Sequence, residues 1–340
     1  MPGLAFRNGE SYLSFKEITM AGVLVWIETS EGKIRKVTRE AAGAGAKLAA
    51  ALDAPLCAVL FNGKDLLPEL GSLGFSKIYT ADGAAFEKYS GEVYAEALAA
   101  AGELCGADVF LTGATALGRD LSASLAARLD AALAIDVTEL LYDAKPLKIV
   151  RPVYSGKLLA EVELTAEKKV ISLRPNVFPI TEKPAASPEL VPLPAGTEAI
   201  RAEVRKAIKA AEGVLDVAEA TIIVSGGRGT GGAAGFKVIE DLARALGGAV
   251  GASRVAVDED WIEYSHQVGQ TGKVVSPVLY IACGISGSTQ HFAGMGTSKF
   301  IIAVNTDPDA PIMGKADFAI VGDLFKVVPV LNEELLKVVK

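Results

Sequence analysis

The residues best suited to binding a cofactor lie between Ala252 and Asp323. This stretch contains both histidines of the protein, His266 and His291. Glycine, hydroxyl and carboxamide residues stand here at the ends of apolar runs, together with the arginine Arg254. A long anionic cofactor with a polar ring uses donors and acceptors of these kinds. The stretch therefore favours a bound redox cofactor over a hydrolytic site.

A glycine-rich turn, Ser225–Gly232, follows an apolar strand pattern and precedes a helix pattern. Its glycines at 227, 229 and 232 match G-x-G-x-x-G, a spacing that lets backbone amides approach a pyrophosphate. The acid expected about 20 residues beyond an NAD-binding turn is absent, because residue 247 is glycine. Three interpretations stay open: an NAD-binding loop, an anion-cradling turn to which Arg228 contributes charge, and a purely structural turn.

Two further loops carry polar side chains. Gly269–Lys273 lacks the spacing of a Walker A phosphate loop, so we interpret it as a loop presenting a carboxamide and a hydroxyl. An apolar strand then ends in a glycine turn, where we expect Ser286 to cap the next helix. His291 in that helix could donate a hydrogen bond to a ligand carbonyl or be a satisfied structural histidine. His266 lies in a polar stretch and is expected at the surface.

Arg254 follows a run of small residues, Gly247–Ala252. We expect close packing to aim its guanidinium inward, where the charge would favour an anionic ring. A solvated arginine at a strand rim is the alternative. The chain has no HExxH or GxSxG motif and its cysteines have no catalytic setting, so we predict neither hydrolysis nor covalent catalysis.

The elements that must position these loops alternate between short strand patterns and longer amphipathic helix patterns, which is typical of parallel α/β units. The expected strands are Val23–Glu28, Ala58–Phe61, Lys77–Thr80, Val109–Thr112, Ala134–Thr138, Thr221–Val224, Leu279–Cys283, Phe300–Val304 and Phe318–Val321. The expected helices are Arg39–Leu52, Tyr94–Cys105, Arg119–Leu129, Phe236–Leu246, Thr289–Met295 and Asn332–Val339. The predicted fold class is α/β, with two doubly wound parallel-sheet domains, the second of them Rossmann-like. Ligands of such domains bind beyond the carboxyl ends of the strands.

Two segments depart from this alternation. We expect Arg151–Val153, Leu158–Leu164 and Lys169–Leu173 to form an antiparallel tail. Lys183–Gly196 holds four prolines, which lack amide donors and forbid a helix, so we interpret it as a linker. A helix carrying Ile200, Val204 and Ile208 is expected to open the second half.

The chain start and the linker suggest domain boundaries. Residues 1–20 carry four charged side chains and no apolar core of a signal peptide, and strand-like sequence begins just after Met20. We therefore interpret residues 1–19 as an N-terminal extension. The N-terminal α/β domain is placed at 20–205 and the C-terminal cofactor domain at 206–340.

Composition excludes several classes of function. The 340 residues favour two domains, and 50% hydrophobic residues supply sizeable cores. A net charge of −7 without a basic tract argues against nucleic acid as a partner. No apolar run reaches the roughly 18–20 residues of a membrane span, so we expect no direct membrane insertion. Cys57, Cys105 and Cys283 form no CxxC pair, which indicates buried thiols in a reducing cytoplasm.

Several motifs of this chain occur together in one known family. They are Val224–Gly229, Val250–Arg254, Gln267–Lys273, Leu279–His291, Ala293–Met295 and Asp323–Pro329. With them, most of residues 220–330 resembles the alpha subunits of electron transfer flavoproteins, the ETF alpha/FixB family. The first half is also similar, through Gly113–Asp120, Arg151–Lys157 and Leu173–Asn176.

The resemblance implies an electron carrier subunit rather than an enzyme. Such a subunit forms a heterodimer with an electron transfer flavoprotein beta subunit, which its N-terminal domain contacts, and holds FAD in its C-terminal domain. It takes electrons from acyl-CoA or other flavin dehydrogenases, as in fatty acid β-oxidation. It passes them to a downstream acceptor such as a quinone-linked oxidoreductase.

The resemblance also implies which residues line the FAD. Carried over motif by motif, they are Arg228, Ser253, Arg254, Gln267, Val268, Gly269, Gln270, Thr271, Ser286, Gly287, Ser288, Thr289, Gln290, His291, Asn305, Asp323 and Leu324. Thr271 is expected near flavin N5 and His291 near the pyrimidine carbonyl. Arg254 is expected over the isoalloxazine, where a cation stabilises the negative charge gained on reduction. Ser288-Thr289 departs mildly from the family, in which more apolar residues are common.

Two alternatives remain open. One is the alpha subunit of an electron-bifurcating complex, in which a second FAD on the beta subunit takes a hydride from NADH. The alpha chain does not separate this from a simple carrier, because the discriminating flavin belongs to the partner. The other is a free-standing NAD-dependent oxidoreductase, which the glycine spacing suggests and the missing acid opposes.

Overall fold

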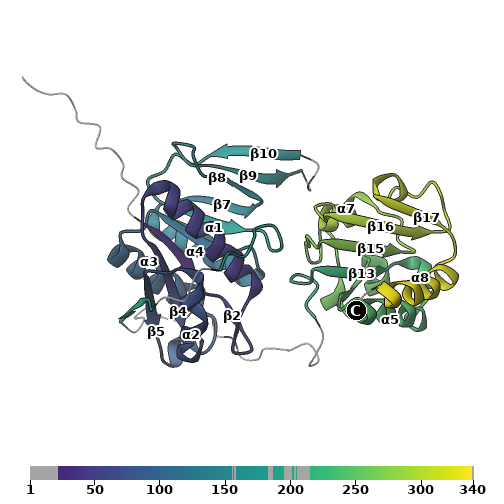
Figure 1. Ribbon diagram of the computed structural model, residues 1–340, viewed down its shortest axis with the longest axis horizontal. Helices are drawn as coiled ribbons and strands as arrows, with labels where there is room; N and C mark the ends of the chain where they lie inside the picture. Colours follow the sequence, from purple (N-terminus) through teal and green to yellow (C-terminus); the bar gives the residue numbers. More distant parts are fainter. Residues whose placement is uncertain are drawn as a thin grey trace, which may run out of the picture.

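Two parallel β-sheets form the centres of two lobes (Figure 1). The computed structural model describes residues 22–338 except 155, 157, 183–186, 195–200, 203 and 205–214. Its mixed α/β architecture with two parallel sheets confirms the predicted fold class. The boundary expected at 205/206, the helix around Ile208 and residues 1–19 lie outside the described residues. The domain limits therefore stay a prediction.

The N-terminal lobe is built on a seven-stranded sheet in the order β12-β5-β4-β1-β6-β11-β7, with every pairing parallel. Its strands are β1 (Val23–Trp26), β4 (Leu56–Phe61), β5 (Lys77–Ala81), β6 (Val109–Gly113), β7 (Ala132–Val137), β11 (Lys169–Leu173) and β12 (Glu189–Pro192). Its helices are α1 (Lys36–Leu52), α2 (Leu67–Leu70), α3 (Gly91–Cys105) and α4 (Ala116–Leu129). A small hairpin pairs β2 (Thr29–Ser30) with β3 (Lys33–Ile34), and an antiparallel sheet joins β8 (Glu139–Leu141), β9 (Lys148–Val153) and β10 (Leu158–Glu163).

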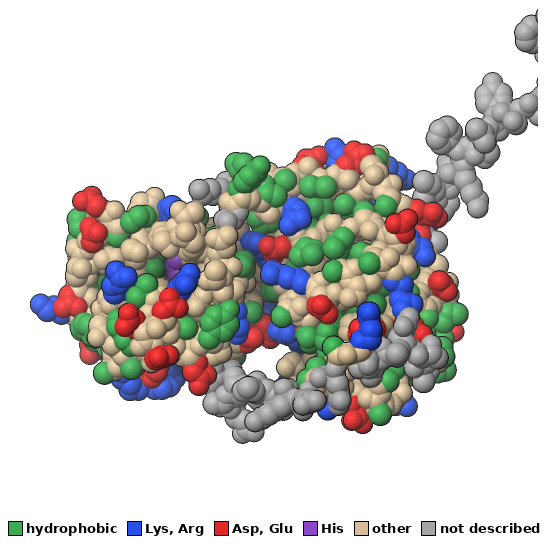
Figure 2. Space-filling view, turned by 180° about the vertical axis from the view of Figure 1, so that it is seen from behind, with side chains coloured by type: hydrophobic (Ala, Val, Ile, Leu, Met, Phe, Trp, Pro, Cys, Tyr) green, Lys and Arg blue, Asp and Glu red, His purple; other side chains and the backbone are tan. Residues whose placement is uncertain are grey.

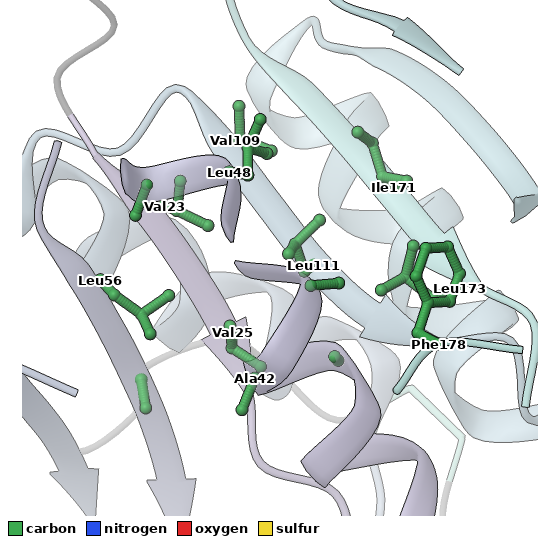
Figure 3. Close-up of a cluster of buried hydrophobic side chains, with 14 of the residues drawn as sticks. Val23, Val25, Ala42, Leu48, Leu56, Val109, Leu111, Ile171, Leu173 and Phe178 are labelled. Atoms are coloured by element: carbon green, nitrogen blue, oxygen red, sulfur yellow. The ribbon is translucent and has the colours of Figure 1, made fainter. Parts of the chain in front are cut away.

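Helices cover both faces of this sheet, so the central strands are buried along their whole length, as parallel strands usually are. Alternate residues of β1 face opposite cores: Val23 and Val25 pack with α1, whereas Leu24 packs with α3 and α4. Figure 3 shows the first core, in which side chains of β1, β6 and β11 meet Ala42 and Leu48 of α1.

The C-terminal lobe is built on a five-stranded parallel sheet in the order β14-β13-β15-β16-β17. Its strands are β13 (Ile222–Gly226), β14 (Ala249–Ala252), β15 (Leu279–Cys283), β16 (Phe300–Asn305) and β17 (Phe318–Val321). Its helices are α5 (Phe236–Ala245), α6 (Arg254–Asp258), α7 (Thr289–Met295) and α8 (Leu324–Val338). Helices α5 and α8 pack together on one face, and α7 lies over the other (Figure 1). β14 lies on one side of β13 and β15 on the other, so the strand order reverses between β13 and β15.

Three expectations about the elements were wrong. Lys169–Leu173 is not part of an antiparallel tail: as β11 it lies parallel between β6 and β7 in the main sheet. Glu189–Pro192, inside the expected linker, extends the same sheet as edge strand β12, where a proline is tolerated. Helix α8 begins at Leu324, earlier than expected, and includes Pro329.

The two lobes touch through polar contacts. Arg174, held by Asp136 through a 2.8 Å bond from its Nε, donates from Nη1 to the Thr297 hydroxyl of the C-terminal lobe at 2.9 Å. Near the start of α1, Arg35 bridges the buried Glu28 to Glu219, which lies just before β13. Basic and acidic side chains are mixed over both lobes on the face shown in Figure 2. Among the described helices, none has the length and apolarity required to cross a bilayer.

The packing of β6 against α1 predicts a large cost for truncation there. Leu111 is fully buried in the core of Figure 3, so Leu111→Ala should lower the free energy of unfolding by about 2–5 kcal/mol. Leu104, 61% exposed on α3, is the control, and Leu104→Ala should change it by about 0.5 kcal/mol or less. Urea titration measures both, and equal losses would contradict this assignment of the core.

Candidate functional site

One cavity of about 540 Å³ lies at the carboxyl ends of the five strands of the C-terminal lobe. Every strand contributes to it through the loop that follows: Arg228 and Gly229 after β13, Ser253 after β14, residues 284–288 after β15, Thr306 after β16 and Asp323 after β17. A ligand of an open α/β sheet binds at such a place, beside the point where the strand order reverses. The sequence predicted this location.

The cavity brings together all but one of the residues expected to line the cofactor. Its lining includes Arg228, Ser253, Arg254, Gln267, Val268, Gly269, Gln270, Thr271, Ser286, Gly287, Ser288, Gln290, His291, Asn305, Asp323 and Leu324. Thr289, the first residue of α7, does not line the cavity. His266 does not line it either; its Nδ1 lies 2.7 Å from the Val250 carbonyl oxygen.

The glycine-rich turn after β13 packs directly on the turn after β15. A Cβ on Gly229 would lie 2.6 Å from the Gly284 Cα, and one on Gly227 would lie 2.5 Å from the Gly284 carbonyl oxygen. The Gly227 amide donates to the Cys283 carbonyl at 3.0 Å, and the Gly229 amide to the Gly284 carbonyl at 2.9 Å. Only glycine permits this approach of two backbones.

These hydrogen bonds decide between the interpretations of the turn. The amides of Thr230 and Gly231 donate to carbonyls of the turn itself, at 3.0 and 3.1 Å. The amides from Gly227 to Gly231 that the G-x-G-x-x-G interpretation needs for a pyrophosphate are therefore largely engaged within the protein. The turn joins two strands closely and presents Arg228, an exposed cation, to the cavity.

Hydrogen bonds hold the loop between the 3₁₀ turn η6 (Tyr264–His266) and β15 in place. The buried Gln267 donates from Nε2 to the Thr271 hydroxyl at 3.0 Å, and Tyr264 donates to the Thr271 carbonyl at 2.7 Å. The Gln270 amide donates to the Gln290 carbonyl at 2.8 Å, which ties the loop to α7. Because the Thr271 hydroxyl accepts from Gln267, its own hydrogen remains for a ligand.

Helix α7 presents His291 from its first turn. The Ser288 hydroxyl accepts from the His291 amide at 3.3 Å and caps the helix, so the expected cap at Ser286 was wrong. The His291 ring is buried, with Nε2 3.0 Å from the hydroxyl of Tyr280, which is fully buried in β15. Its Nδ1 is buried and makes no hydrogen bond of good geometry in the described chain, although an interaction with the Val268 backbone partly offsets the lowering of the pKa of the ring by burial.

Burial controls the charge of this histidine. It lowers the pKa of His291 to about 4, because the charged ring would lose its hydration. Burial likewise raises the pKa of the Tyr280 phenol, which stays protonated and can donate to Nε2. In that tautomer His291 is neutral and its Nδ1 carries the proton as a donor.

Arg254 lies at the rim of the cavity. Its side chain is 68% exposed, and its Nε donates to Asp258 one turn further along α6 at 3.1 Å. The expectation that tight packing aims this guanidinium inward was therefore wrong. The small residues before it form β14, which ends at the fully buried Ala252. The arginine comes after this buried strand and begins the next helix.

Two predicted lining residues also hold neighbouring turns in place. Asn305 donates from Nδ2 to the Ile285 carbonyl at 2.9 Å and accepts from the Asp307 amide at 3.0 Å. Asp323 accepts from the Phe325 amide at 2.9 Å at the start of α8. Their polar atoms therefore shape the cavity walls.

Sequence reasoning missed part of the site. The lining also includes Gly229, Val255, Gly284, Ile285, Val304, Thr306, Asp307, Ala310 and Gly322. Most of them are direct neighbours of predicted residues at strand ends, and that adjacency was the available signal. Tyr280 was missed because an apolar strand gives no sign of which ring meets a histidine 11 residues later.

Comparison with known proteins places these residues in a family. Residues 23–228 match the electron transfer flavoprotein domain, and residues 216–296 match the electron transfer flavoprotein FAD-binding domain. The alpha subunit of the electron transfer flavoprotein of Thermoanaerobacterium thermosaccharolyticum is 42% identical over 322 residues, covering 92% of this chain and 98% of the relative. That of Bacillus subtilis is 40% identical over 315 residues, covering 92% and 96%. Protein FixB of Clostridium saccharobutylicum is 37% identical over 324 residues, covering 94% and 97%.

The buried histidine makes stability depend on pH. The folded chain keeps His291 neutral down to about pH 4, whereas an unfolded histidine titrates near 6.5. Between these values the unfolded chain binds more protons, so stability is lost as the pH falls from 6.5 towards 4. The loss from this residue should approach about 3 kcal/mol.

Urea denaturation of the wild type and of His291→Asn at pH 7, 5.5 and 4.5 measures this effect. The difference between the two proteins should shrink or reverse at low pH, because the variant lacks the histidine. Glu40, whose pKa burial raises to about 7, titrates in both proteins and is removed by the subtraction. Parallel stability curves would show that His291 is not held neutral.

Proposed function

The chain belongs to the electron transfer flavoprotein family as an alpha subunit that binds FAD, and from this premise we propose that its C-terminal cavity holds the flavin. Paired with a beta subunit, the protein carries electrons from flavin dehydrogenases, acyl-CoA dehydrogenases among them, to a downstream acceptor such as a quinone-linked oxidoreductase. The cytoplasm, where its three free thiols stay reduced, is the proposed compartment.

The chemistry of the cavity wall supports this proposal. His291 Nδ1 and Ser253 Oγ are buried polar atoms that make no hydrogen bond of good geometry in the described chain, and both residues line the cavity. Buried polar groups of native proteins almost always have partners, so two such atoms at one cavity indicate a polar ligand. A neutral imidazole donor fits a ring carbonyl, and the arginines at positions 228 and 254 fit an anionic cofactor.

The side chains would bind and tune the flavin, which itself supplies the redox chemistry. We assign the 17 residues carried over from the family to the FAD site, with Thr289 acting through the start of α7 because it does not line the cavity. The Thr271 hydroxyl, fixed by Gln267, is assigned to flavin N5. His291 is assigned to the pyrimidine carbonyl and Arg254 to the face of the ring.

Reconstitution tests the function. The full chain, purified with its beta subunit, should take up FAD and show a flavin absorption spectrum that substrate-reduced dehydrogenase bleaches. A colourless complex that retains no flavin would refute the proposal. Two flavins per complex together with NADH oxidation would instead identify the bifurcating form.

The glycine contact predicts a selective loss of FAD. Gly229→Ala places a methyl group 2.6 Å from the Gly284 Cα, so the two turns must separate and the cavity changes shape. FAD affinity should fall at least about tenfold, the equivalent of roughly 1.4 kcal/mol. Gly314→Ala is the control, since a Cβ there meets nothing within 4 Å. Flavin release measured by ultrafiltration should separate the two variants, and equal retention would contradict the role of the contact.

Removing the rim cation should make the flavin harder to reduce. Arg254→Ala should lower the two-electron midpoint potential by a few tens of millivolts, because a charge pair near a surface is worth about 1 kcal/mol and about 30 mV corresponds to ~1.4 kcal/mol. Arg244→Ala on α5, where the arginine is 70% exposed and pairs with Asp241, is the control. Dye-equilibrated spectral titration gives both potentials. An unchanged value for Arg254→Ala would remove the assigned role.

A further inference from the structure

An arginine of the N-terminal lobe donates a hydrogen bond to the segment that follows α7 in the other lobe. We propose that Arg174 is a positioning residue for the flavin: through Thr297 it holds the junction between α7 and the loop Gln267–Lys273, the two segments assigned to the flavin ring. This inference rests on the proposed function of the cavity. Arg174 belongs to the motif Leu173–Asn176, to which the proposed function gives no role.

Asp136 fixes the direction of this arginine. Asp136 lies in β7 with a left-handed φ of 66°, where the pairing of β7 with β11 shifts its register. An irregularity of this kind in a strand re-aims a side chain. The Asp136 carboxylate accepts from both Nε and Nη2 of Arg174, the first at 2.8 Å. Because the guanidinium is planar, this fork also fixes the direction of the third nitrogen, Nη1, which donates to Thr297 at 2.9 Å.

The pair of Asp136 and Arg174 is buried and charged. Arg174 is 5% exposed. Burial alone would raise the pKa of Asp136, but the hydrogen bonds and the charge of Arg174 outweigh burial and lower it. Arg119 adds a second positive charge 3.7 Å from the same carboxylate. Asp136 therefore stays ionised at neutral pH, and the fork keeps the strength of a charge-assisted pair.

The turn that carries the arginine makes a second contact with the C-terminal lobe. Pro175 follows Arg174 and restricts the backbone φ. Asn176 then donates from Nδ2 to the carbonyl of Ala220, just before β13, at 3.2 Å. The side-chain oxygen of Asn176 accepts from Lys36 at 2.7 Å, which holds the amide in this orientation. Two contacts from one short turn thus fix where the arginine meets the C-terminal lobe.

In the C-terminal lobe, Thr297 lies at one end of a row of contacts between α7 and the chain that precedes β15. The hydroxyl oxygens of Thr297 and the buried Ser276 are 2.6 Å apart. Because Thr297 accepts from Arg174, its own hydrogen is available to Ser276. The neighbouring Val275 amide donates to the Gly294 carbonyl of α7 at 2.7 Å. The arginine therefore donates into the contact that joins the helix to this segment.

The other end of this row lies at the cavity. A Cβ on Gly294 would lie 2.4 Å from the Gly269 Cα, so the helix and the loop touch with no side chain between them. Gly269 lines the cavity, with Thr271 two residues further along the loop and His291 one turn earlier in α7. A shift of α7 against the loop would therefore change the spacing of the groups assigned to flavin N5 and to the pyrimidine carbonyl.

The test is FAD binding by the full chain with its beta subunit. Thr297→Val keeps the size of the side chain and removes the hydroxyl, so the FAD dissociation constant should rise at least about threefold. Thr297→Ser keeps the hydroxyl and should bind FAD like the wild type. Arg174→Lys keeps the charge but loses the planar fork, so it should weaken FAD binding as much as Arg174→Met does.

A double variant tests whether the two residues act through one bond. Arg174→Met combined with Thr297→Val should weaken FAD binding no more than the stronger single variant, because the bond can be lost only once. Arg39→Met is the control: Arg39 pairs with Glu69 inside the N-terminal lobe, and its loss should leave FAD affinity unchanged. The Thr297 variants keep Asp136 paired with Arg174, so they decide the question even where the Arg174 variants fold poorly.

The visible circular dichroism of the bound flavin gives a second readout, because it depends on how the cavity wall surrounds the ring. Thr297→Val should change this spectrum, and Thr297→Ser should not. Variants that lower the unfolding temperature yet keep wild-type FAD affinity and dichroism would show that the contact only joins the lobes, which would overturn the proposal. A wild-type complex that takes up no FAD would instead refute the proposed function, and this inference with it.

Discussion

The site of this protein depends on the contact between two glycine turns. The turns after β13 and β15 touch through Gly229 and Gly284, and two backbone hydrogen bonds join them where the strand order reverses. No side chain fits between them, so the strand ends stay close and the cavity opens beside the contact. The position of the cavity thus follows from sheet topology, and the absence of two Cβ atoms lets the two turns beside it touch.

The sequence predicted this lobe well because each strand there ends in residues of unusual type. Runs such as Leu279–Cys283 break abruptly into glycine and hydroxyl residues, which marks both the strand and the edge where a ligand binds. β14 was not predicted, because Ala249–Ala252 has the composition of a tight loop rather than a strand. In the other lobe, Lys169–Leu173 has a clear strand pattern, but pairing partners are set by tertiary contacts that no local pattern contains.

What the sequence could not predict concerns pairs of residues. Tyr280 of a strand meets His291 of a helix, with the phenol oxygen 3.0 Å from the ring Nε2. Each partner alone has an ordinary interpretation as a buried residue of an apolar element. Only the contact gives the histidine a defined tautomer, so chemistry of this kind appears first in three dimensions.

Exposure of Arg254 limits what one charge does to a cofactor. Its guanidinium is 68% exposed and shares its field with Asp258, so in open solvent its influence on a ring would be weak. The same charge acts several times more strongly where water is excluded, since the interaction scales inversely with the effective dielectric constant. His291 differs, because it is buried by its own lobe and holds its neutral donor form regardless of what covers the rim. The proposed tuning by the arginine therefore requires closure over the cavity mouth, whereas the proposed recognition by the histidine requires only the lobe itself.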